Sequence, residues 1–340
     1  MPEQHLNLSP LLSYLKETPA YRQVVESLSQ GSRVMVIEGA KPYLLAGLYQ
    51  KLGLPLVVIT PRPEAAHRLQ EELSLWCPVS AAVHLFPEPD ALPYERLSPD
   101  TATVQERLRT LSLLLGQESK NSAPIVVASA WAAAYKTIPH DHFAQACHSI
   151  RRGMKASPLE LVNRWQELGY KLEATVEVPG QMGRRGGLVD IFPPNAELPY
   201  RLEFLGNEVE SIRTFDPTTQ RSLTLTELIY IIPAREMLVR QEQIVNFLSQ
   251  GHVEEGMKEE LAWLDQGQAF PGEEFYAPLF NQGSFFDYLP QPLLLVLNEP
   301  EEIKMELEEM ERRALEVRGE KADLPPHFPT PFLRWTELAA

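Results

Sequence analysis

The sequence predicts an α/β protein whose parallel sheet is split in the chain by an inserted α+β domain with a small antiparallel sheet. Three observations lead to this fold class. Residues 33–138 alternate short apolar runs with amphipathic stretches, a pattern typical of parallel sheets covered by helices. Residues 148–236 change to a period-two alternation broken by turn residues, as antiparallel strands do. The apolar run 293–297, much later in the 340-residue chain, can rejoin the first sheet.

Three domain segments follow from this pattern. Residues 1–147 are the first part of the α/β domain, 148–236 are the inserted α+β domain, and 237–340 are the second, helix-rich part of the α/β domain. Their basic and acidic side chains number 12 and 14, 11 and 12, and 8 and 20, so most of the net charge of −15 lies in the last part. Because phosphate backbones are held by basic patches, this distribution argues against autonomous DNA binding.

Runs rich in valine and isoleucine predict the buried strands of the first part, and leucines at helical spacing predict its helices. The strands are expected over 33–38, 56–60, 81–86 and 125–129. The helices are expected over 43–52, 63–76 and 103–115. Strands that alternate with helices in this way form a parallel sheet with both faces covered.

In the inserted domain, Ser157 as N-cap, Pro158 at the first helical position and Glu160 predict a helix that ends at Gly169. Five alternating segments predict strands. They cover 171–178, 187–192, 199–205, 208–215 and 223–232. Proline, glycine and asparagine between them indicate tight turns, so this domain is a small antiparallel sheet with one helix.

In the last part, apolar residues at helical spacing between glutamates predict a long helix with a solvated acidic face. These residues are Ile303, Leu307, Met310, Ala314 and Val317. The run 293–297 predicts a buried strand, and the proline-rich segment 324–329 predicts an extended linker or docking segment.

The turn at 38–44 occupies the place where a nucleotide-binding α/β domain carries its phosphate loop. Such a loop needs G-x-x-x-x-G-K-[ST], with glycines that bring backbone N–H groups around the phosphates and a hydroxyl for magnesium. Here only Gly39 is present, Lys41 follows two residues later, Pro42 removes a backbone donor, and Leu44 cannot bind a metal. The sequence therefore predicts a degenerate nucleotide loop at Gly39 and Lys41.

Other catalytic and cofactor motifs are missing as well. His140 and His142 lack a third metal ligand at suitable spacing, and the glycines around Arg184 do not form a dinucleotide-binding fingerprint. Two cysteines exclude a disulfide scaffold and an all-cysteine zinc site, and no apolar run reaches the roughly 18 residues of a membrane helix. We therefore expect a non-catalytic, cytoplasmic chain that needs no cofactor or metal and does not bind membranes.

Charged side chains gather instead on the predicted antiparallel sheet. In the strand over 199–205, Arg201 and Glu203 share one face, and Lys171, Arg184 and Arg185 lie on adjoining segments. Because arginine forms planar, bidentate contacts with carboxylates, such a surface suits a protein partner with acidic groups. The alternative is intramolecular, with Arg201–Glu203 and Arg185–Asp190 as surface ion pairs worth less than about 1 kcal/mol each.

Two long stretches resemble the bacterial transcription-repair coupling factor family. They are GRRGGLVDIFPPNAELPYRLEFLGNEVESIRTFD at 183–216, and LPYERLSP at 92–99 followed by RLRTL at 107–111. The first is similar, more loosely, to the excision-repair subunit UvrB. The resemblance implies a RecA-like sheet domain split by an inserted domain, as in UvrB, and it implies that the inserted domain recruits the damage sensor UvrA.

By position, Arg185, Arg201 and Glu203 match the family, and Lys171 stands where the family commonly has arginine. Together with Arg184 they are the expected UvrA-binding residues. The resemblance also implies a longer protein, an ATP-dependent DNA translocase that binds RNA polymerase and DNA, of which this chain is a monomeric, N-terminal piece.

Two functional hypotheses follow. In the first, the chain is an interaction module that recruits UvrA to stalled RNA polymerase for nucleotide excision repair. In the second, it is a degenerate NTPase or helicase fragment with residual binding of nucleotide or damaged DNA.

Overall fold

The computed structural model describes residues 7–78, 81–116, 123–321 and 324–338. The chain divides into two compact units, which are described separately. The first unit consists of Met1–Glu88, Ser119–Ala133 and Leu289–Leu307, and the second of Pro89–Glu118, Ala134–Tyr288 and Glu308–Ala340. The second unit thus groups the inserted residues with segments on both sides of them. The boundaries at 147/148 and 236/237 remain predictions.

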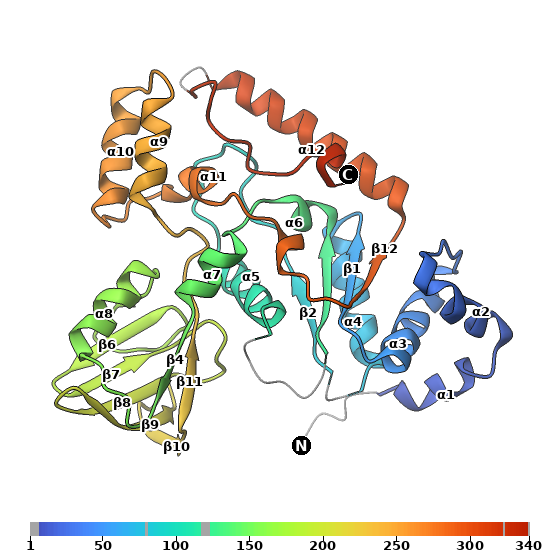
Figure 1. The fold of residues 1–340 in the computed structure, drawn as a ribbon, viewed down its shortest axis with the longest axis horizontal. Coiled ribbons are helices and arrows are strands. Elements are labelled where there is room, and N and C mark those ends of the chain that lie inside the picture. The colour runs from blue at the N-terminus through green and yellow to red at the C-terminus, as the bar shows by residue number, and fades with distance from the viewer. Residues whose placement is uncertain (1–6, 79–80, 117–122, 322–323, 339–340) are drawn as a thin grey trace. The chain divides into compact units, whose positions relative to one another are not determined.

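The first unit is built on a four-stranded parallel sheet (Figure 1). Its strands are β1 (Leu56–Thr60), β2 (Val83–Phe86), β3 (Ile125–Ser129) and β12 (Leu294–Leu297), in the order β12-β1-β3-β2. Leu56 is aligned with both Ile125 and Leu294. The late strand therefore rejoins the first sheet, which confirms the split parallel sheet. β1 and β3 are buried along their whole length, as runs of valine and isoleucine predict.

Prolines and glycines mark ends of the helices in the first unit. They are α1 (Leu12–Leu15), α2 (Pro19–Ser27), α3 (Lys41–Leu52) and α4 (Pro63–Trp76). α4 has exactly the predicted bounds and starts at its proline, and α3 ends at Gly53, whose φ of 64° is left-handed. Leu69 and Leu73 of α4 pack with Leu45 of α3 and with the sheet.

The strand predicted over 33–38 is wrong. Residues 31–37 form no ladder with any described strand, and Glu38–Ala40 is a short 3₁₀ helix. Met35 and Ile37 are exposed to solvent over 101% and 81% of their reference areas. Strand preference reflects packing against cross-strand neighbours, and this run has none. β12, expected to be buried, is half exposed, because Leu295 and Leu297 retain 43% and 44% of their accessible area.

The inserted domain, part of the second unit, is a six-stranded sheet with one helix, α8 (Pro158–Glu167), on one face (Figure 1). The strands, in spatial order, are β10 (Ser222–Leu225), β9 (Glu208–Phe215), β8 (Tyr200–Leu205), β7 (Leu188–Ile191), β6 (Gln181–Arg185) and β5 (Lys171–Leu172). All pairs are antiparallel except β5–β6. The N-cap Ser157 accepts a hydrogen bond from the Glu160 N–H at 3.5 Å, and Trp165 is completely buried against the sheet.

Three strand predictions in this domain need correction. β6 was not expected, because its sequence Gln-Met-Gly-Arg-Arg has neither alternation nor branched residues, and pairing with β7 creates it. The segment 171–178 holds only two strand residues. The segment 223–232 divides between β10 and β11 (Leu228–Ile231), and β11 pairs with β4 (His148–Arg151) in a separate two-stranded sheet.

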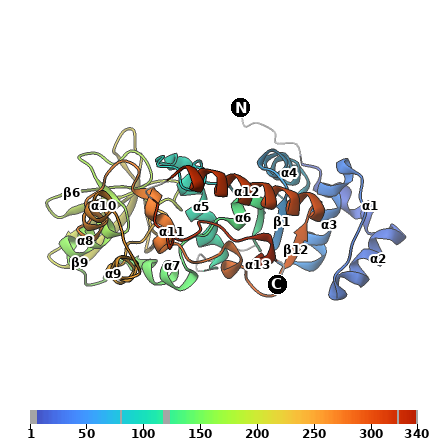
Figure 2. The same ribbon diagram turned by 90° about the horizontal axis from the view of Figure 1, so that it is seen from above.

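Helices dominate the rest of the second unit. They are α5 (Thr101–Leu114), α7 (His140–Ala146), α9 (Gln241–Ser249), α10 (Glu255–Asp265), α11 (Ala277–Phe280) and α13 (Trp335–Leu338). α6 (Ala130–Ala134) and α12 (Pro300–Glu320) each cross the division between the units, and Figure 2 shows α12 as one continuous helix. Ile303, Leu307, Met310 and Ala314 of α12 are buried, as predicted. Within the described residues, no helix is both long and apolar enough to span a membrane.

A buried ion pair joins the end of the inserted domain to α5. Arg107 donates from Nε and Nη2 to the two carboxylate oxygens of Glu236, at 2.7 and 2.8 Å. The Thr137 hydroxyl donates to the same carboxylate at 2.7 Å, and Asn281 Nδ2 donates to the Glu236 backbone carbonyl at 2.7 Å. Four segments far apart in sequence therefore meet at Glu236.

Candidate functional site

The strand register places four of the five predicted partner-binding residues on one face of the six-stranded sheet. Lys171 is aligned with Gln181, which shares its face with Arg185 four residues on. Arg185 is aligned with Leu188, and Leu188 with Glu203. Arg201, two residues before Glu203, points the same way. We call this side, opposite α8, the outer face; it carries Lys171, Arg185, Arg201 and Glu203.

Arg184 does not belong to the outer face. It is aligned with Val189, and Val189 is aligned with Leu202; both are completely buried on the side that α8 covers. Adjacent residues of a strand point to opposite faces, so Arg184 and Arg185 are separated by the sheet. The expectation that these two arginines form one surface is therefore corrected.

Arg201 is the most constrained of these side chains. Its Nε and Nη2 donate to the two Asp190 carboxylate oxygens, both at 2.8 Å, and its Nη1 donates to the Gln220 carbonyl at 3.1 Å. Its guanidinium carbon lies 4.6 Å from the centre of the Phe215 ring. The hydrogen bonds with Asp190 raise the pKa of Arg201 above its ordinary value. Only 18% of the Arg201 side chain is exposed.

The two ion pairs that the sequence suggested within this domain, Arg201–Glu203 and Arg185–Asp190, are not the ones that form. The structure pairs Arg201 with Asp190 instead, because the register puts these two residues directly opposite each other on β8 and β7. Glu203 accepts a hydrogen bond from the Ser211 hydroxyl at 3.1 Å, and Arg185 donates to the Ala174 carbonyl.

Lys171, Arg185 and Glu203 are exposed, in contrast to Arg201. Within the described part of the chain, the side chains of Lys171 and Arg185 form no ion pair. The sheet beneath them is rigid in its packing: Val189, Ile191 and Leu202 are completely buried. These three exposed side chains can therefore meet a partner without first breaking internal ion pairs, and they combine two cationic groups with one carboxylate.

One outer-face cation was missed by the sequence reasoning. Arg213 of β9 is aligned with Arg201, so it points to the outer face, and it is exposed. The signal was available, because the strand over 208–215 was predicted correctly and period two separates Arg213 from the buried Ile212.

In the predicted degenerate nucleotide loop, the ammonium group of Lys41 is paired with two carboxylates. Lys41 Nζ lies 2.7 Å from Glu38 and 2.8 Å from Glu299, and Arg68 also pairs with Glu38. Burial alone would lower the pKa of Lys41, but the hydrogen bonds with Glu299 and Glu38 outweigh it and raise that pKa. The hydrogen bond from Lys41, assisted by Arg68, lowers the pKa of Glu38. The carboxylates of Glu38 and Glu299 thus occupy the space around the Lys41 ammonium.

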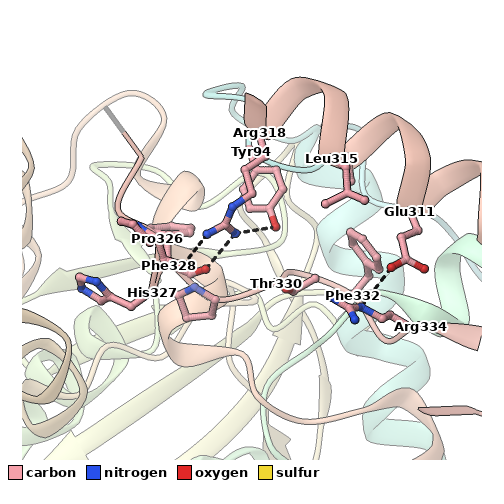
Figure 3. A pocket seen from close by; sticks show the side chains of 12 residues that line it. Tyr94, Glu311, Leu315, Arg318, Pro326, His327, Phe328, Thr330, Phe332 and Arg334 are labelled. Carbon is pink, nitrogen blue, oxygen red and sulfur yellow. Dashed lines mark hydrogen bonds and ion pairs between the residues drawn. The ribbon is translucent and has the colours of Figure 1, made fainter. Parts of the chain in front are cut away.

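The remaining candidate features are a surface hollow and the arrangement of the metal-ligating side chains. A hollow of about 420 Å³ lies between α12 and the C-terminal segment (Figure 3). Most of its charged groups are paired: Arg318 donates to the Tyr94 hydroxyl at 3.2 Å and to the Phe328 carbonyl at 3.1 Å, and Arg334 pairs with Glu311 at 3.1 Å. The buried Nε2 of His327, which also lines the hollow, has no hydrogen-bond partner among the described residues. These bonds, with the buried Phe328, anchor the segment as a docking segment. Among the described residues, no group of three or more His, Cys, Asp or Glu side chains is arranged to hold a metal.

The outer face belongs to a domain of known class. Residues 149–237 match the UvrB interaction domain family. The match contains every strand from β5 to β11 together with α8.

The wider chain is similar to transcription-repair-coupling factors, which confirms the predicted resemblance. It is 35% identical over 230 residues to the factor of Myxococcus xanthus, a match that covers 65% of this chain and 19% of the relative. It is 29% identical over 268 residues to that of Haemophilus influenzae, covering 77% and 23%. With the Bacillus subtilis factor it shares 25% identity over 331 residues, covering 89% and 27%. The chain thus spans about a fifth to a quarter of the length of these relatives.

Proposed function

We propose that this chain is a non-catalytic interaction module that recruits UvrA in transcription-coupled nucleotide excision repair. The observation that carries the proposal is the outer face, where exposed Lys171, Arg185 and Glu203 stand on a rigid sheet inside a UvrB interaction domain. Exposed cations without an internal ion pair are free to bind carboxylates of a partner. Arg201 supports this surface from within, by fixing Asp190 and the backbone at Gln220.

The wider role follows from the similarity to transcription-repair-coupling factors, whose name joins transcription to repair. We propose that a longer protein containing this module binds RNA polymerase and DNA through other domains. The module itself then supplies the link to the excision machinery. Its acidic last part, with 8 basic and 20 acidic residues over 237–340, does not favour DNA as its own ligand.

The first test measures binding of the 340-residue chain to purified UvrA by biolayer interferometry. The double variant Lys171→Ala/Arg185→Ala is expected to weaken binding at least tenfold, because it removes two exposed cations from the outer face. Arg184→Ala is the matched control, since it removes an exposed arginine from the opposite face of the same strand, and we expect its Kd to equal that of the unsubstituted chain. A folded double variant that binds UvrA as tightly as the control contradicts the proposed surface.

The second test addresses nucleotide. We propose that the loop at Gly39 and Lys41 does not bind ATP, because Glu38 and Glu299 already neutralise Lys41 and would repel a triphosphate. Calorimetric titration with magnesium–ATP is expected to give no saturable heat. Saturable micromolar binding that disappears in Lys41→Ala would favour the NTPase-fragment hypothesis instead.

A further inference from the structure

The charge of Arg213 lies where it is unfavourable for the stability of the sheet. It lies directly opposite Arg201 across β9 and β8. Like charges at directly opposed positions of a sheet are destabilising. Asp190 neutralises Arg201, but the Arg213 side chain forms no ion pair or hydrogen bond with any residue that the structure describes. Arg213 thus retains an uncompensated charge on β9, next to the edge strand β10.

Arg201 cannot bind a partner carboxylate in the bidentate manner without losing its own bonds. Two of its nitrogens are engaged by Asp190 and the third by the Gln220 carbonyl, and Phe215 covers one side of the guanidinium plane. Arg213 has all five of its N–H donors available and is exposed. A bidentate contact at this end of the outer face must therefore come from Arg213.

An exposed leucine lies beside Arg213 on the far side from Arg201. Leu225 of the edge strand β10 is aligned with Arg213, so it shares the outer face, and 60% of its area is exposed. An arginine next to an exposed aliphatic side chain is the composition of a protein interface, where arginine is enriched and an apolar contact excludes water around the ion pair. Strands are spaced about 4.8 Å apart, so Arg213 on β9 lies roughly 14 Å across the sheet from the β6 strand that carries Arg185.

We propose that Arg213, with Leu225 beside it, is a second partner-binding element of the outer face and binds a carboxylate on an acidic surface of UvrA. This inference rests on the proposed function. It extends the contact from β5–β8 to β9 and β10, and it assigns a bidentate carboxylate contact to Arg213. Arg201 is then a positioning residue, which holds the sheet that presents Arg213.

The test compares UvrA binding by Arg213→Ala, Arg213→Lys and Leu225→Ala in the 340-residue chain, with Arg184→Ala as the control arginine on the opposite face. We expect Arg213→Ala to raise the Kd about tenfold, and Arg213→Lys to recover part of that loss, because lysine keeps the charge but not the planar fork. Leu225→Ala is expected to raise the Kd about threefold. The unfolding temperatures of all four variants should equal that of the unsubstituted chain.

Three other results of this binding experiment would each contradict a different part of the two proposals. If Arg213→Ala binds like Arg184→Ala while Lys171→Ala/Arg185→Ala is weakened, the role of Arg213 is refuted and the proposed function stands. If Arg213→Lys binds as weakly as Arg213→Ala despite an unchanged unfolding temperature, the loss does not follow the charge, and the carboxylate contact is refuted. If the unsubstituted chain does not bind UvrA, both proposals are overturned.

Discussion

Replacing Arg107 with alanine is expected to lower the free energy of unfolding by about 3–5 kcal/mol, the range for removing one partner of a buried ion pair. Only 1% of the Arg107 side chain is exposed, and Glu236 is 14% exposed. Without Arg107, the Glu236 carboxylate keeps only the Thr137 hydroxyl among the hydrogen bonds described above, in a site with little access to water. The cost comes mainly from this uncompensated charge rather than from the loss of the bonds themselves.

Urea unfolding followed by circular dichroism would measure this effect. Arg152→Ala is a suitable control, because Arg152 pairs with Glu227 at 3.3 Å at the surface, with 55% and 75% of the two side chains exposed. Such exposed pairs contribute less than about 1 kcal/mol. The double variant Arg107→Ala/Glu236→Ala should be more stable than the sum of the two single effects predicts, because it removes both charges. Strict additivity would show that the pair does not act as a unit.

The second large effect is expected at Arg201. Replacing it with alanine should destabilise the inserted domain by about 2–3 kcal/mol, because Asp190 would remain mostly buried without its bidentate partner. The variant also loses the bond to the Gln220 carbonyl and the contact with the Phe215 ring. Sequence reasoning alone treats Arg201 as an exposed residue whose substitution costs little, and the structure reverses that expectation.

Thermal unfolding of Arg201→Ala beside Arg213→Ala would test this contrast. The two arginines are directly opposite each other on the same face, but Arg213 is exposed and should cost less than about 0.5 kcal/mol. Equal unfolding temperatures for the two variants would contradict the structural role of Arg201. The result also bears on the binding experiments: a loss of UvrA binding in Arg201→Ala has to be measured at a temperature where the variant is folded.

Much of the fold could be predicted from the sequence because local and tertiary preferences agree there. The helix over 63–76 has a proline at its start and a clear leucine stripe, and it is found with those bounds. The strand over 208–215 alternates cleanly and is also found as predicted. Prediction failed where pairing decides the outcome. The run at 33–38 has strand-forming residues without a partner strand, whereas β6 has unfavourable residues and a partner on each side.

The candidate site, too, could be predicted from local sequence patterns but not where strand pairing decides the outcome. Residue types and period two were enough to place Arg201 and Glu203 on one face of a strand. They could not give the register between strands, on which the pairing of Arg201 with Asp190 depends. The separation of Arg184 from Arg185 was missed because β6, the strand that carries both, was not predicted. Register also brings in Arg213, which lies 28 residues after Arg185 in the sequence. A surface formed across several strands is a property of their alignment.

The pairing of β4 with β11 has a consequence for how such a chain can arise and be rebuilt. His148, one residue before the stretch that matches the UvrB interaction domain family, is aligned with Ile231, six residues before the end of that stretch. The first and last strands of the inserted domain therefore lie side by side, so the chain enters and leaves this domain at neighbouring positions. A module attached in this way can be exchanged for another, or transplanted to a foreign host protein, without stretching the chain that carries it.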